Sequence, residues 1–90
     1  MTKNKPLIKN IAETGHRNGH EIVLYNDDFN TFEYVISTLI EVCDHTPEQA
    51  EQVALITHYK GKCGVKSGSR DELDPVCSEL NNRNLTAKIN

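Results

Sequence analysis

One segment, residues 21–35, constrains the fold more than any other part of the chain. It opens with the apolar, β-prone run Glu21–Tyr25, which has the length of a single strand. The three short polar residues Asn26–Asp28 follow, and such side chains favour turns because they bond nearby backbone groups. A helix start comes next, with Asn30 as a candidate N-cap and Glu33 as its capping-box partner. The segment therefore predicts a strand, a polar corner and a helix in direct succession.

Two helices in a row are expected after this corner. Apolar residues at spacings of three and four predict the first helix over about residues 31–43. Thr46 as N-cap, with Pro47 at the first helical position, predicts the start of the second helix. Gly61 suits the left-handed residue that follows a helix, so the second helix should end just before it.

The last third of the chain predicts a strand, a helix and a strand. A short strand is expected over residues 62–66, a turn over 67–69, and a final alternating strand over 85–89. The helix between them extends to about residue 83 and has two possible starts. With Asp74 as N-cap, Pro75 sits at the favoured first position. With Ser69 as N-cap, Pro75 lies beyond the first turn, where proline is costly.

The element order β-α-α-β-α-β in 90 residues predicts one small α+β domain. We expect a three-stranded antiparallel sheet packed on three helices, formed by residues 20–90. Residues 1–19 are aperiodic, polar and contain glycine, so we expect them to form a flexible N-terminal arm.

Composition excludes several classes of function. A net charge of −3 and a sequence pI near 5.7 argue against a broad basic surface for nucleic acid. No apolar run reaches the length that spans a bilayer, so no membrane partner is expected. The three cysteines, Cys43, Cys63 and Cys77, form no CxxC pair, which argues against a zinc site and a disulfide framework. Reduced thiols indicate a cytoplasmic protein. We expect no metal and no cofactor.

The residues alone leave the chemistry of the corner open. Turn formation by itself accounts for Asp27 and Asp28, and His58 suits the end of a helix because of the helix dipole. An acid–base enzyme could instead use one of the two aspartates with His58. A nucleophilic pair of Cys63 with His58 is also conceivable, although no third orienting group is evident.

Three motifs, taken together at their spacing, resemble the ClpS adaptor family. These are the Asn-Asp-Asp corner at 26–28, the His-Tyr-Lys-Gly sequence at 58–61 and the Cys-Gly-Val sequence at 63–65. The resemblance covers about residues 22–89. It implies a binding module without catalytic residues, which recognises N-degrons: proteins with a free α-amino group and a bulky hydrophobic first residue. Implied partners are these substrate proteins and the N-terminal domain of a ClpA- or ClpC-type AAA+ unfoldase, working with the ClpP protease.

The resemblance also implies a binding site. Asn26, Asp27 and His58 resemble the ligands of the substrate α-amino group, and Asp28 belongs to the same corner as possible support. The following residues resemble the wall of the pocket for the first side chain: Asn30, Thr31, Phe32, Val35, Ala54, Thr57 and Leu85.

The chain departs from the family pattern at several positions. Ala54 stands where methionine is common, Thr57 where an aliphatic residue is common, and Thr31 where proline is usual. Residues 66–75 match poorly, so no unfoldase-docking residue is transferred. A second family of similar shape, the C-terminal domain of the ribosomal stalk protein, gives the alternative of an interaction domain without N-degron binding.

Overall fold

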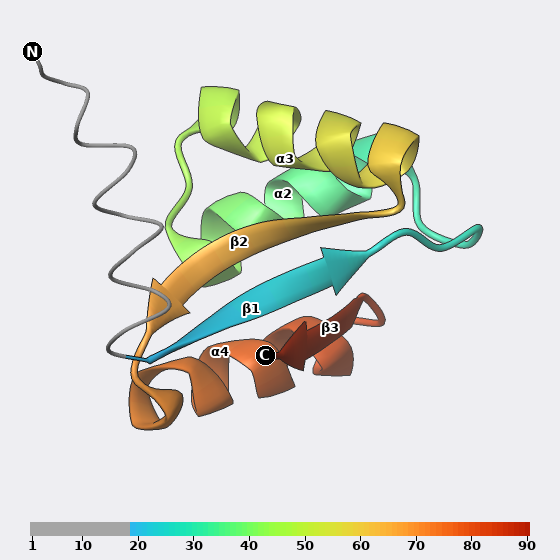
Figure 1. Ribbon diagram of the computed structural model, residues 1–90. Helices are drawn as coiled ribbons and strands as arrows, with labels where there is room; N and C mark the ends of the chain where they lie inside the picture. The colour runs from blue at the N-terminus through green and yellow to red at the C-terminus, as the bar shows by residue number, and fades with distance from the viewer. Residues whose placement is uncertain (1–18) are drawn as a thin grey trace, which may run out of the picture.

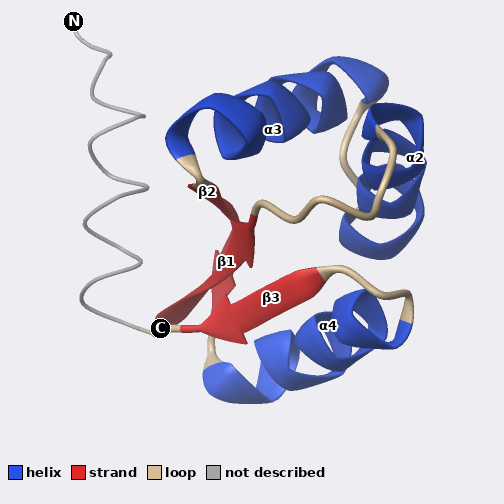
Figure 2. Ribbon diagram, turned by 90° about the vertical axis from the view of Figure 1, so that its right-hand side faces the viewer, coloured by secondary structure: helices blue, strands red, loops and turns tan. Residues whose placement is uncertain are grey.

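The sheet is built around its first strand. In the computed structural model, which describes residues 19–90, three antiparallel strands lie in the order β2-β1-β3, and the three helices lie on the same side of this sheet (Figures 1 and 2). The elements are β1 (His20–Tyr25), α2 (Phe32–Cys43), α3 (Pro47–Lys60), β2 (Lys62–Gly68), α4 (Arg70–Asn82) and β3 (Thr86–Ile89). The predicted α+β class and element order are confirmed. Within residues 19–90, no helix has both the length and the apolar character needed to cross a membrane.

The central position of β1 explains its composition. Its partners are antiparallel on both edges, with Leu24 opposite Cys63 of β2 and Ala87 of β3. The register with β2 shifts between Ile22 and Val23, which leaves Val65 as an extra residue in β2. A bulge of this kind turns the strand locally, and Val65 is buried in the core.

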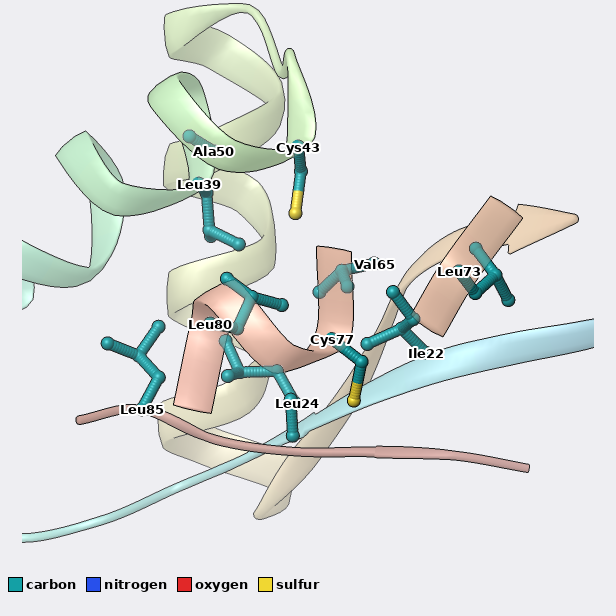
Figure 3. Packing of buried hydrophobic residues seen from close by; sticks show 11 residues of the cluster. Ile22, Leu24, Leu39, Cys43, Ala50, Val65, Leu73, Cys77, Leu80 and Leu85 are labelled. Carbon is teal, nitrogen blue, oxygen red and sulfur yellow. The ribbon is translucent and has the colours of Figure 1, made fainter. Parts of the chain in front are cut away.

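Side chains from all three helices meet the inner face of the sheet in one core. Ile22, Leu39 and Leu80, from β1, α2 and α4, are each fully buried. Figure 3 shows these side chains converging. The cluster consists of Ile22, Leu24, Leu39, Cys43, Ala50, Val65, Leu73, Cys77, Leu80, Leu85 and Ala87.

Local capping signals correctly predicted α3. The Thr46 hydroxyl accepts a hydrogen bond from the Gln49 N–H, and the Gln49 side chain bonds back to the Thr46 N–H. Pro47 occupies the first helical position, and Gly61 ends the helix with φ 94°. A residue with a Cβ would be strained at this φ, so glycine suits the position.

The predicted cap of α2 was wrong by one residue. Thr31, not Asn30, is the N-cap, and its hydroxyl accepts from the Tyr34 N–H at 3.1 Å. The residue three positions after Thr31 is tyrosine, so the predicted capping box with Glu33 is absent from this helix start. The Asn30 side chain is committed elsewhere, to Asp27 and to the backbone of Asn84.

The connection between β2 and α4 also differs from the prediction. No separate turn exists at residues 67–69, because β2 continues through Gly68, paired with His20 of β1. Ser69 then caps α4 directly, in a capping box with Glu72. Of the two predicted starts, the structure selects Ser69, and Pro75 lies inside the helix. The last strand begins at Thr86, one residue later than predicted.

Candidate functional site

A pocket of about 560 Å³ opens where the corner after β1 meets the C-terminal half of α3. In Figure 1 the loop after β1 and the C-terminal end of α3 lie at the same end of the molecule. The pocket is lined by residues of β1, the corner, α2 and α3, and by the residue before β3. The lining residues are Leu24, Asn26, Asp27, Asp28, Asn30, Phe32, Val35, Ala54, Leu55, Thr57, His58, Tyr59 and Leu85.

Asp27 organises the corner. Its Oδ1 accepts hydrogen bonds from the backbone N–H groups of Phe29 at 2.9 Å and Asn30 at 2.8 Å. Its Oδ2 accepts from the side-chain amide of Asn30 at 2.9 Å. An ionised carboxylate offers about four acceptor sites, so three are filled within the protein and one remains on Oδ2.

These bonds keep Asp27 ionised. Partial burial raises the pKa of its carboxyl, but the hydrogen bonds from Asn30 and Phe29 outweigh this effect and hold the pKa below its ordinary value of 3.8. Because the folded-state pKa lies below the unfolded-state value, Asp27 stabilises the fold at neutral pH. That contribution is lost as the pH falls below the unfolded value and through the folded one.

The turn after α3 anchors the other side of the corner. The Asn26 N–H donates to the Gly61 carbonyl at 2.9 Å, which ties the start of the corner to the end of α3. His58 lies in the last turn of that helix, with its ring edge-on to Tyr59 at 5.2 Å between centroids. Asn26, Asp28 and His58 are all exposed, so their polar atoms are accessible at the rim of the pocket.

The interior wall of the pocket is apolar and continuous with the core. Leu24 and Leu85 line the pocket and also belong to the hydrophobic core. Ala54 is 4% exposed, whereas Phe32 on the facing helix is 37% exposed. The Thr57 hydroxyl donates to the Val53 carbonyl at 2.8 Å, so this buried polar group is satisfied within α3.

The structure brings together every site residue predicted from the sequence except one. Thr31 does not line the pocket, because its side chain caps α2. Three lining residues were not predicted: Leu24, Leu55 and Tyr59. Leu24 could have been found from strand alternation, since it shares a face with Ile22 and lies one residue before the end of β1. Leu55 could also have been found, because it lies three residues before His58 and so on the same side of the helix.

The geometry does not favour the nucleophilic alternative. Among residues 19–90, no hydrogen bond joins the His58 ring to Cys63, and the Cys63 thiol lies 3.3 Å from the Gly64 carbonyl. Burial raises the pKa of the Cys63 thiol, and the nearby Glu21 carboxylate raises it further. A reactive cysteine needs a lowered pKa, because the thiolate is the nucleophile. Burial likewise raises the pKa of Cys43, to about 11.

Comparison with known proteins gives one consistent family. The family model described as "ATP-dependent Clp protease adaptor protein ClpS" matches residues 16–88. The ClpS adapter protein of Desulforapulum autotrophicum is 35% identical over 72 residues, covering 71% of this chain and 69% of that protein. The ClpS of Nitratidesulfovibrio vulgaris strain Miyazaki F is 48% identical over 46 residues, covering 49% of this chain and 46% of that protein. The chain thus spans about half the length of the Nitratidesulfovibrio vulgaris relatives that it matches.

A solved structure has the same fold. ClpS2 of Agrobacterium tumefaciens, determined bound to L-phenylalaninamide, superposes with a TM-score of 0.63 at 19% identity, covering 79% of this chain and 95% of that one. The family model covers most of the chain, including all three helices and all three strands except the last residue of β3. This chain belongs to the ClpS family of ATP-dependent Clp protease adaptor proteins.

Proposed function

We propose that this protein is an adaptor that binds N-degron proteins and delivers them to a Clp protease. It binds the free α-amino group and the bulky hydrophobic first side chain of such proteins. It passes them to a ClpA- or ClpC-type AAA+ unfoldase acting with ClpP in the cytoplasm. The observation that carries this proposal is a single pocket with an acceptor-rich rim and an apolar wall.

The rim suits an α-ammonium group. This group has three N–H donors and no acceptor, so it requires acceptors around it. Asn26 can offer an amide oxygen, Asp27 the unused site on Oδ2, and His58 a neutral ring nitrogen. Hydrogen bonds from a charged donor to a carboxylate are stronger than neutral ones. Asp28 adds a second negative charge beside them. An acetylated amine would leave acceptors unpaired, which costs free energy.

The wall suits a large apolar side chain. Phe32 and Val35 from α2 face Ala54 and Thr57 from α3, with Leu85 as a further wall residue. Burying apolar surface contributes about 25 cal/mol per Å². The similar ClpS2 of Agrobacterium tumefaciens was solved with L-phenylalaninamide, a molecule that combines a free α-amino group with an aromatic side chain. That ligand has the two features for which this pocket has complementary surfaces.

Titrations of peptides that differ only in their first residue test the proposal. We expect peptides beginning with Phe or Leu to bind, and those beginning with Gly or Glu to bind much more weakly. Peptide recovered after binding should be intact, because an adaptor does not cleave it. Equal binding of all first residues would instead favour the alternative, a stalk-like interaction domain without N-degron recognition. Altered peptide would favour an enzyme that uses Asp27 or Asp28 with His58.

Delivery is proposed to depend on the N-terminal arm. This prediction concerns residues 1–19, nearly all of which lie outside the described residues, and it rests on their aperiodic polar composition. A chain that starts at His20 is expected to melt like the full chain and to bind a Phe-initiated peptide normally. It should fail to promote degradation of an N-degron substrate by the unfoldase and ClpP. Undiminished degradation with the shortened chain would refute this role for the arm.

A further inference from the structure

The side-chain amide of Asn30 connects two parts of the chain that are far apart in sequence. Its Nδ2 donates to Asp27 Oδ2 at 2.9 Å and to the Asn84 carbonyl at 2.9 Å. An asparagine amide has two N–H donors, so both are used within the protein. Asn30 also lines the pocket. It is therefore more than a wall residue, because its amide holds the carboxylate of the corner against the turn between α4 and β3.

Asn84 offers a fixed point for this contact. It has a left-handed backbone, with φ 73°, and its N–H donates to the Asn81 carbonyl at 3.0 Å. The residue before it, Arg83, is tied to α2 twice. The Tyr34 hydroxyl donates to the Arg83 carbonyl at 2.8 Å, and the Arg83 guanidinium pairs with Glu41. The turn is thus attached to α2 independently of Asn30.

The hydrogen bonds of Asp27 define what Asn30 does for it. Two backbone N–H groups, from Phe29 and Asn30, fill Oδ1. The Asn30 amide fills one of the two acceptor sites on Oδ2 and so determines the direction of the site that remains. Without this amide, the carboxylate would keep its Oδ1 bonds, but the orientation of Oδ2 would no longer be fixed.

We infer that Asn30 is the positioning residue for amino-group recognition. Its amide, anchored on the Asn84 carbonyl, orients the Asp27 carboxylate so that the one free acceptor site of Oδ2 meets the ligand. This deepens, and rests on, the proposed binding of a free α-amino group. A purely structural Asn30 would affect the stability of the fold. A positioning Asn30 affects how strongly the site distinguishes an amine from an amide.

Two measurements on the full-length chain test the inference. The first follows the Asp27 side-chain carboxyl by NMR through an acid titration with no peptide present. The second compares the affinity of a Phe-initiated peptide with that of its N-acetylated form by calorimetry. Other titratable groups face the same pocket and must be followed too: Asp28 on the corner, and His58 and Tyr59 on α3. On the turn side, Arg83 is already paired with Glu41 and Glu79.

Asn30→Ala is expected to raise the titration midpoint of Asp27, because the lost amide bond favoured the ionised form. It should also reduce the preference for the free amine on the order of threefold to tenfold, the effect of one hydrogen bond. Asn30→Leu keeps nearly the shape of the side chain but has no N–H donor and adds no charge, so it should reduce the preference as well. It provides the test if the alanine variant does not fold.

Tyr34→Phe is the matched control. It removes one of the two ties between α2 and the α4–β3 turn but leaves the Arg83–Glu41 pair and the Asp27 contacts intact, so neither measurement should change. An unchanged Asp27 midpoint in Asn30→Ala would overturn the inference, and so would a raised midpoint with an unchanged preference. If the wild-type protein shows no preference for the free amine, the proposed function fails, whereas the peptide-free titration still reports whether Asn30 holds Asp27.

Discussion

Replacing His58 or Asp27 by alanine is expected to weaken binding of a Phe-initiated peptide by roughly 1.5–3 kcal/mol, the range for a hydrogen bond to a charged group. His58 lies on the exposed end of α3 and lines the pocket, so His58→Ala removes an acceptor without disturbing the core. N-acetylation of the peptide should cost at least as much.

The Asp27 variant needs a stability measurement beside it. Asp27 accepts three hydrogen bonds within the corner, so Asp27→Ala also removes local structure. A thermal melt of each variant separates the two effects, and Glu51→Ala is a suitable control because Glu51 is an exposed carboxylate on α3 outside the pocket lining. Equal affinity for the free and acetylated peptides in the wild-type protein would rule out amine recognition.

Ala54→Met is expected to weaken Ile-initiated peptides selectively, by about 1–3 kcal/mol relative to Leu-initiated ones. Ala54 is buried in the pocket wall, and methionine would add three heavy atoms there. A β-branched first residue carries extra bulk on its Cβ, so it loses more from a narrowed pocket than leucine does. The native protein should therefore accept Ile, and to a lesser degree Val, together with Phe, Leu, Tyr and Trp.

The measurement is a pair of titrations, with Ile- and Leu-initiated peptides, on the native protein and on Ala54→Met. Ile56→Met serves as the control, because Ile56 is a partly exposed residue of the same helix that does not line the pocket. If the Met variant lowers both affinities equally, Ala54 does not control access. Phe32 would then be the next residue to test, since it is 37% exposed at the pocket and could lean over the same space.

Features set by neighbouring residues could be predicted from the sequence. Helix α3 begins with a capping box of Thr46 and Gln49 and ends at Gly61, so the residues that determine its two ends lie within or beside the helix. The approximate bounds of β1 and α2 follow from periodicity for the same reason. The corner, His58 and most of the pocket wall were predicted through the resemblance of three motifs to a known family, and their roles toward a ligand stay predictions.

Features set by distant residues could not be predicted in this way. Asparagine is a favoured N-cap residue, but the side-chain amide of Asn30 instead donates a hydrogen bond to the carbonyl of Asn84, which is 54 residues away. Residues 67–69 have turn-forming composition, yet pairing with His20 and Glu21 extends β2 through Gly68. Pro75 likewise lies inside α4, although its missing N–H would make an isolated helix unfavourable at that position.

The strand order has a consequence for the way this chain folds during synthesis. The central strand β1 is made first, and its two partners follow after α3 and after α4; Ile22 pairs with Ile89 of the last strand. Pairing at such sequence separation forms slowly, because loop closure must precede the contacts that reward it. The capped helices α2 and α3, by contrast, pair locally. A nascent chain therefore exposes the β3-facing edge of this apolar strand until β3 has been made, and during that interval this adaptor is itself a candidate for chaperone binding.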